Sequence, residues 1–248
     1  MKNKSLLIYT CCDNKYAMFI PIFILSHCIH NDGCSIEIGT SLKESECTFI
    51  DVIKLLQSTY TNCKINVIFE AFQVRNNKAI YDGNIMQLNT VRFIRKPNIE
   101  CKYVYITDID IINTEPILEK HISIMNKFNS NYSNIVRPSG KSLSGLHFSE
   151  YNVYYPINKT NINLSINDEE ILFNLINNKI GVNYKIDIRP VHGIHVSLSR
   201  QPFNKVGWEL DKHTKEEWGT IKNNQLYNMC LTSPYLVNAD NIISNYYS

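Results

Sequence analysis

Residues 102–112 read KYVYITDIDII, a hydrophobic run that ends on two carboxylates, Asp108 and Asp110. Aromatic and β-branched residues dominate the run, which is the composition of a β-strand. An apolar run without polar alternation predicts a strand that is covered on both faces, as in a parallel sheet flanked by helices. In such a sheet, ligands bind at the carboxyl ends of the strands. This stretch therefore predicts an α/β fold and also where its site lies.

Upstream of this stretch, predicted strands alternate with predicted helices. The boundaries that we expect are, in chain order, strand 6–9, helix 16–29, strand 35–38, helix 49–57, strand 64–72 and helix 84–94. Alternation of this kind is typical of βαβ units. It predicts a mostly parallel central sheet flanked by helices.

Downstream of Asp110 the pattern is mixed. Strand-like segments are expected at 134–137 and 146–155, a helix at 168–177, and one or two strands within 184–198. After Pro202 the chain is polar, and we expect it to be irregular. Since no linker or shift of composition interrupts the chain, we predict one domain over 1–248, with an alternating half (1–110), a mixed half (111–203) and an irregular extension (204–248).

The composition narrows the function classes. The 248 residues are 44% hydrophobic and 19% charged, with a formal net charge of +2, which argues against disorder and against binding of nucleic acid through bulk charge. The longest apolar stretch, 17–25, is shorter than a membrane-spanning helix and contains Pro21. Eight scattered cysteines indicate reduced thiols. We expect a cytoplasmic protein, and the richness in Asn, Ile and Lys favours a bacterial or phage source.

Asp108 and Asp110 stand at i and i+2, so they share a strand face or converge in a tight turn. Paired carboxylates after a central strand suit Mg²⁺ or Mn²⁺ bridged to a diphosphate. The alternative is structural: Asp108 caps a following turn, and Asp110 is merely solvated.

The loop after the first predicted strand reads TCCDNKY, from Thr10 to Tyr16. A carboxylate at Asp13 and a ring at Tyr16 suit the hydrogen bonding and stacking of a nucleotide base, with Thr10 and Cys11 beside them. The alternative is an ordinary helix cap at Asp13 and local packing of Tyr16. Because the loop lacks glycine, a Rossmann or P-loop phosphate site is excluded.

Residues 189–202 read RPVHGIHVSLSRQP. His195, or His192 as the alternative, could be a third ligand of a metal ion that the two aspartates also bind. Arg200 could bind phosphate oxygens. A structural histidine is the other interpretation. Two histidines without a third ligand at the usual spacing do not indicate zinc.

Together these motifs resemble the GT-A fold of nucleotide-sugar glycosyltransferases, and most closely family 8. The loop 13–16 is similar to the family's nucleoside-binding D-x-N-Y loop, with Lys15 as an extra residue. The segment NTVRF at 89–93 resembles the helix that carries a donor-binding arginine, here Arg92. The segment 105–110 resembles the metal motif Y-L-D-x-D, with Thr107 as an extra residue or as a difference of register.

Three later segments resemble family motifs in the same order. Residues 143–147 are similar to an asparagine-and-glycine segment, with Ser144 in place of Asn. Residues 168–172 resemble a D-Q-D helix start, with Glu169 in place of Gln. Residues 195–203 resemble the late H-F-x-G-x-x-K-P-W motif, with Leu198 in place of Gly and Arg200 one position before the phosphate-binding lysine.

The resemblance implies a metal-dependent glycosyltransferase that uses Mn²⁺ or Mg²⁺. The donor would be a nucleoside diphosphate sugar, with UDP-sugars favoured, and the acceptor a hydroxyl of a carbohydrate or lipid-linked glycan, as in bacterial capsule or lipopolysaccharide. Family 8 implies retention of configuration. An inverting enzyme would need a carboxylate base, for which Asp168 and Glu169 are candidates.

Two other functions stay open at this point. One is a catalytically inactive GT-A-like module that binds carbohydrate or protein, and the other is a nucleotidyltransferase. A peripheral contact with the inner face of the cell membrane is a further hypothesis. It draws on the aromatic residues of the C-terminal stretch, namely Trp208, Trp218, Tyr235, Tyr246 and Tyr247.

Overall fold

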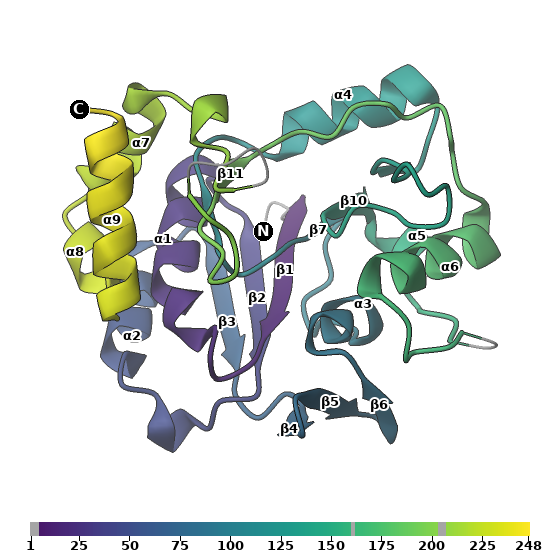
Figure 1. Cartoon of the computed structure of the whole chain (residues 1–248), viewed down its shortest axis with the longest axis horizontal. Coiled ribbons are helices and arrows are strands. Elements are labelled where there is room, and N and C mark those ends of the chain that lie inside the picture. The colour runs from purple at the N-terminus through teal and green to yellow at the C-terminus, as the bar shows by residue number, and fades with distance from the viewer. Residues whose placement is uncertain (1–4, 160–161, 203–206) are drawn as a thin grey trace.

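The central sheet holds the order β3-β2-β1-β7-β10-β9 in a computed structural model that describes residues 5–159, 162–202 and 207–248. β1, β2, β3 and β7 run parallel, whereas β10 is antiparallel to β7 and to β9. The predicted α/β class, with a mostly parallel sheet flanked by helices, is confirmed (Figure 1). The single-domain assignment stays a prediction.

The strands of this sheet are β1 (Leu6–Cys12), β2 (Ser35–Thr40), β3 (Lys64–Ile68), β7 (Tyr103–Ile106), β9 (Tyr132–Ser133) and β10 (His147–Glu150). A second ladder pairs β8 (Ile111–Asn113) with β11 (Gly193–His195). A third, small sheet consists of β4 (Gln73–Arg75), β5 (Lys78–Tyr81) and β6 (Asn84–Met86).

The α-helices are α1 (Ile20–His30), α2 (Ile50–Thr59), α3 (Val91–Ile94), α4 (Leu118–Phe128), α5 (Tyr151–Tyr154), α6 (Asp168–Ile180), α7 (Lys215–Lys222), α8 (Tyr227–Cys230) and α9 (Pro234–Tyr246). Short 3-10 helices are η1 (Ala17–Phe19), η2 (Glu44–Glu46), η3 (Leu88–Thr90) and η4 (Leu210–Lys212). Side-chain caps begin three of these helices: Asn167 caps α6, Thr214 forms a capping box on α7, and Ser233 caps α9 before Pro234.

Helices cover the sheet on both sides (Figure 1). One hydrophobic core lies between the sheet and α1, α2 and α7–α9, with Ile8, Phe23 and Trp218 among its members. The other core lies between the sheet and α3, α5 and α6, with Tyr9 and Leu172 among its members. All residues of β1, β2 and β7 are buried, as expected of strands without polar alternation. Seven of the eight cysteines are buried as well.

Two predicted boundaries are wrong in the segment between β3 and α3. The strand predicted at 64–72 stops at Ile68, and the helix predicted at 84–94 begins only at η3, because 84–86 form β6. Asn76 and Asn77 have positive φ, as do Asp82 and Gly83. Two adjacent residues of this kind form the tight turns that favour β-hairpins, so this segment folds into the small antiparallel sheet.

The mixed half also differs from the prediction in detail. The segment 146–155 divides into β10 and α5, 134–137 contributes only a bridge between Val136 and Leu143, and 184–198 contributes the single strand β11. Helix α4 was not predicted. Its buried side chains, His121, Ile124 and Met125, recur at helical spacing, so the sequence carried an amphipathic pattern that the prediction overlooked.

The prediction of an irregular extension over 204–248 is wrong for its described part. Residues 207–248 form η4, α7, α8 and α9, which pack against α1 and share its hydrophobic core; residues 204–206 lie outside the described residues. Trp208 and Trp218 are each only 3% exposed, so they are core residues and cannot anchor the chain in a membrane. Within the described residues, no helix combines the length and the apolar composition needed to cross a bilayer.

Candidate functional site

The site begins at the carboxyl ends of β1 and β7, which are neighbours in the sheet. Tyr9 pairs with Ile106, and the backbone N–H of Thr107 donates to the carbonyl of Tyr9 at 3.0 Å. The loops that follow these two strands therefore leave the sheet side by side. Asp13 and Tyr16 come from the first loop, and Asp108 and Asp110 from the second.

A cavity of about 540 Å³ lies at this edge of the sheet. Its wall includes most of the residues that the sequence singles out, namely Cys11, Asp13, Tyr16, Arg92, Asp108, Asp110, Asp168, Glu169, His195 and Arg200. Residues from both halves of the chain thus meet around one space.

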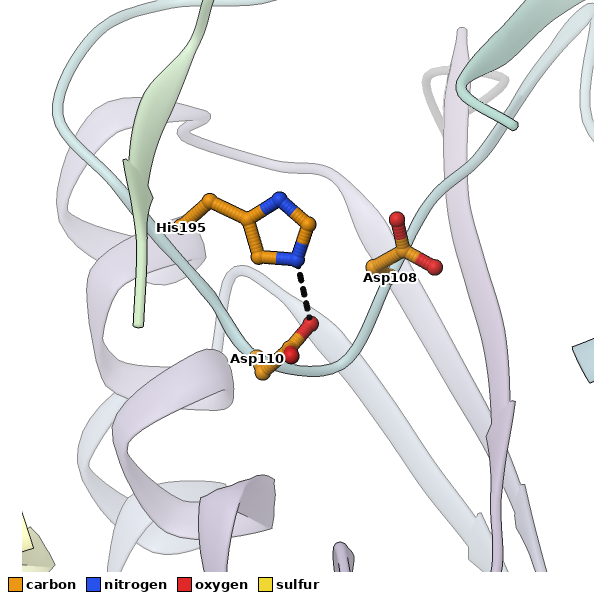
Figure 2. Close-up of side chains that lie close together, drawn as sticks. All are labelled: Asp108, Asp110 and His195. Atoms are coloured by element: carbon orange, nitrogen blue, oxygen red, sulfur yellow. Dashed lines mark ion pairs between the residues drawn. The ribbon is translucent and has the colours of Figure 1, made fainter. Parts of the chain in front are cut away.

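Asp108, Asp110 and His195 form the chemical centre of the cavity (Figure 2). One possible ligand atom from each lies within 4.8 Å of the other two. Nε2 of His195 is 3.1 Å from Oδ1 of Asp110. Two carboxylates and one imidazole, converging in this way, form a donor set that suits a divalent cation such as Mn²⁺ or Mg²⁺.

The ladder between β8 and β11 brings His195 to the aspartates. His195 pairs with Ile111, and the backbone N–H of Val196 donates to the carbonyl of Asp110 at 2.9 Å. Gly193 allows this close approach: a Cβ on it would lie 2.2 Å from the carbonyl oxygen of Ile112. Residues of the late segment are therefore fixed directly against the loop of the aspartates.

The ring of His195 is oriented from both sides. Its Nδ1 accepts a hydrogen bond from Nη1 of Arg200 at 2.9 Å, since a guanidinium can only donate. Nε2 is then the nitrogen directed at Asp110. Burial works to lower the pKa of His195, but the hydrogen bond and the charge of Asp110 outweigh it and raise that pKa above its ordinary value.

Arg92 is buried between two carboxylates. Nη1 lies 2.9 Å from Oδ1 of Asp108, and Nη2 lies 3.2 Å from Oδ2 of Asp168. Burial alone would lower the pKa of this guanidinium, but Asp108 and Asp168 more than compensate and raise it. Arg92 is thus a fixed cation that joins the metal-ligand candidates to the start of α6.

Asp168 and Glu169, the two predicted catalytic carboxylates, are both held in ion pairs. Burial raises the pKa of Asp168, while its partner Arg92 opposes that shift. Glu169 accepts from Nη2 of Arg137 at 2.7 Å and from the backbone N–H of Gly145 at 3.0 Å. These contacts favour a positioning role over that of a free base.

In the loop after β1, Asp13 caps a turn, as the structural alternative for this residue predicts. Oδ1 of Asp13 accepts from the backbone N–H of Tyr16 at 3.0 Å, which caps the turn before η1. Tyr16 is partly buried, packs against Phe19 with ring centroids 5.9 Å apart, and still lines the cavity. Burial raises the pKa of its hydroxyl, so the side chain presents a neutral ring and hydroxyl.

Two predicted residues lie elsewhere. Thr10 is fully buried within β1 and does not line the cavity. His192 points away from the aspartates: its Nδ1 donates to Glu115 at 2.8 Å, and its Nε2 lies 2.9 Å from Nε2 of His121. The structure therefore brings His195 to the aspartates and leaves His192 in a buried polar network. Phe203, the last residue of the late motif, lies outside the described residues.

Three charged residues of the cavity were missed by the sequence reasoning: Arg137, Arg189 and Glu209. Arg189 opens the segment that contains both histidines, so its position next to them was the available signal. Arg137 and Glu209 lie in segments without a motif, and only the folded chain places them at the site.

No protein-family model matches this chain, and no curated protein matches it. Among solved structures, it is similar to the apo form of the glycosyltransferase GlyE from Streptococcus pneumoniae TIGR4, with a TM-score of 0.48 and 13% identity over 98% of this chain and 64% of GlyE. It is also similar to an active-site mutant of LgtC, with a TM-score of 0.46 and 11% identity over 87% of this chain and 99% of LgtC. The chain thus spans less than two thirds of the length of GlyE.

Proposed function

We propose that this chain is a metal-dependent glycosyltransferase that moves a sugar from a nucleoside diphosphate sugar to an acceptor hydroxyl. The observation that carries the proposal is the convergence of Asp108, Asp110 and His195 within 4.8 Å. This group sits in a cavity at the carboxyl edge of a mostly parallel sheet, where nucleotide ligands bind. The order of motifs in the sequence supports the same function.

We propose that Asp108, Asp110 and His195 hold the cation, with Mn²⁺ favoured because imidazole joins the carboxylates. When bound, the cation neutralises charge on the diphosphate leaving group. In the transfer, the acceptor oxygen bonds to the anomeric carbon of the sugar, and the bond from that carbon to the phosphate oxygen breaks. The nucleoside diphosphate leaves with the electron pair, and the hydroxyl proton is released to solvent.

Arg200 has a second role in this proposal. A neutral imidazole that offers Nε2 as a ligand carries its proton on Nδ1, so Nδ1 can no longer accept from Arg200. The guanidinium, 2.9 Å from that nitrogen in the structure, is then available to phosphate oxygens, for which its geometry is suited.

The remaining roles concern the donor. Asp13 and Tyr16 line the part of the cavity beside β1 and would hold the nucleoside, with UDP favoured by the family 8 resemblance. Arg92 would hold Asp108 in place and contact the sugar or the diphosphate. Retention of configuration, a bacterial surface glycan as product and weak peripheral membrane contact remain parts of the proposal that rest on sequence alone.

Donor turnover tests the proposal. The purified full chain is incubated with Mn²⁺ and a panel of UDP- and GDP-sugars, and the released nucleoside diphosphate is measured. We expect release from at least one donor, loss of release with a chelator, and recovery when Mn²⁺ is restored. Binding of Mn²⁺ and UDP without turnover of any donor would contradict catalysis and favour the inactive binding module.

A further inference from the structure

Glu209 has an unusual backbone conformation at the wall of the cavity. Its φ of 55° and ψ of 35° are left-handed, a region that disfavours residues with a Cβ. Of the six described non-glycine residues with positive φ, four are Asn or Asp in turns or at a helix end. The other two are Glu70 and Glu209, and Glu209 is the one that lines the cavity.

The residues around Glu209 hold it in this conformation. Trp208 and Leu210 on either side are both 3% exposed and belong to the core beside α1. The hydroxyl of Tyr247 in turn donates to the carbonyl of Leu210 at 2.7 Å. Burial of both neighbours therefore offsets the unfavourable conformation, and strain kept in this way at a cavity wall is a reason to look for a function.

Among the described residues, Glu209 is also the carboxylate of the cavity with the loosest ion pair. Asp168 lies 3.2 Å from Arg92, and Glu169 lies 2.7 Å from Arg137. Asp108 and Asp110 belong to the metal-ligand group, and Asp13 caps its own turn. Glu209 is 3.8 Å from Arg189, with its side chain 24% exposed. It therefore keeps room for a hydrogen bond from a ligand.

We propose that Glu209 binds the acceptor by accepting a hydrogen bond from its attacking hydroxyl, and that Arg189 orients the carboxylate for this. The inference rests on the proposed transferase function. It assigns the acceptor side of the cavity to the wall formed by Arg189 and Glu209, while the donor occupies the side of β1 and β7. The class of acceptor that this pair recognises is a neutral hydroxyl, such as that of a sugar.

The conservative variant Glu209→Gln is the first test. Transfer is measured with Mn²⁺, the UDP-sugar that turns over, and a panel of methyl hexosides, with water as the simplest acceptor in the same reaction. Because a hydrogen bond to a charged carboxylate becomes a weaker one to a neutral amide oxygen, we expect kcat/KM for the acceptor to fall roughly tenfold. The Kd of UDP with Mn²⁺ should not change. Glu216→Gln, on an exposed residue of α7 outside the cavity wall, is the matched control.

Glu209→Gly separates the proposed role from a structural one. Glycine tolerates the left-handed conformation without cost, so we expect Tm to rise while acceptor transfer falls as in Glu209→Gln. A lower Tm together with weaker binding of UDP would show that Glu209 is structural and would overturn the inference. Normal transfer by both variants would overturn it as well. If the unaltered protein turns over no donor, the proposed function itself fails, and this inference fails with it.

Discussion

Asp108 and Asp110 stand two residues apart and nevertheless have different surroundings. Asp108 pairs with the buried Arg92 and keeps a side chain that is 24% exposed, whereas Asp110 is buried and pairs with His195. Asp110 thus faces the late segment of the chain, and Asp108 faces α3 and α6. This difference allows the two carboxylates to be tested separately.

Asp110→Asn tests the metal site with little effect on the fold. An amide is a neutral and weaker ligand, so we expect the affinity for Mn²⁺ to fall by about 100-fold or more. This exceeds the loss of affinity that follows when only a residue that hydrogen-bonds a metal ligand is removed. Calorimetry with Mn²⁺ measures this, and thermal unfolding checks the fold. Asp211→Asn, on a carboxylate that is 68% exposed, is the matched control. Unchanged Mn²⁺ affinity in Asp110→Asn would remove this residue from the site.

Arg92→Met tests the buried ion pairs. The variant leaves Asp108 and Asp168 without their shared cation, and Asp168 has a side chain that is only 11% exposed. We expect the free energy of unfolding to fall by about 3 kcal/mol, the low end of the range for broken buried pairs, because Asp108 is partly solvated. Urea denaturation measures the change.

The double variant Arg92→Met with Asp168→Asn should recover part of that loss, because it no longer buries an unpaired charge. A loss in Arg92→Met below about 0.5 kcal/mol, the size of an ordinary surface substitution, would show that the pairs do not stabilise the fold.

At the scale of elements, the short ladder of β8 and β11 decides whether the site exists. It is separate from the central sheet, yet it carries His195 to Asp110 through the pairing of His195 with Ile111. Only glycine fits at the start of β11, since a Cβ on Gly193 would lie 2.2 Å from a carbonyl oxygen. The geometry of the metal-ligand group therefore depends on one backbone contact.

Gly193→Ala tests this dependence. The added methyl group has to push β11 away from β8 and so displaces His195. We therefore expect Mn²⁺ affinity to fall by about tenfold or more, the size of loss seen when the groups that orient a metal ligand are removed. Far-UV circular dichroism should show that the central sheet persists. The matched control is Gly219→Ala in α7, where a Cβ would meet no atom closer than 3.7 Å. Native Mn²⁺ affinity in Gly193→Ala would show that the ladder tolerates the change.

At the scale of the whole molecule, histidines make the fold sensitive to acid. Burial lowers the pKa of six of the seven histidines, and it lowers the pKa of His27 and of His147 to about 3. The folded protein keeps these rings neutral, whereas the unfolded chain protonates them below about pH 6.5. The unfolded state therefore binds more protons between these values.

We expect the free energy of unfolding to be highest near neutral pH and to fall as the pH drops from about 6.5 towards 3. Each fully buried histidine contributes about 1.4 kcal/mol per pH unit in that window. Urea denaturation at several pH values measures the slope. The variant His147→Phe, which removes one of these rings from a buried strand, should have a shallower slope, and equal slopes would contradict the assignment of His147.

Local pattern was enough to predict the first half of the fold. The strands at β1, β2 and β7 and the helix α1 follow from long apolar runs, which bury themselves in the same way whatever the rest of the chain does. The pair Asp108 and Asp110 could be recognised for a related reason, since residues that stand two positions apart in the sequence are neighbours in any fold. β10 and β11 were predicted only as parts of longer segments, and β8, β9, α4 and the C-terminal helices were missed; the partners of all these elements lie far away in the chain.

The sequence by itself determined the α/β class and the place of the two aspartates, because both depend on neighbours along the chain. Only the tertiary structure decided that His195 and not His192 meets those aspartates, and that Glu209 and Arg137 reach the same cavity. These choices depend on the pairing of β8 with β11 and on the packing of Trp208 and Leu210. Such contacts join residues far apart in the chain, and their energies exist only once the chain is folded.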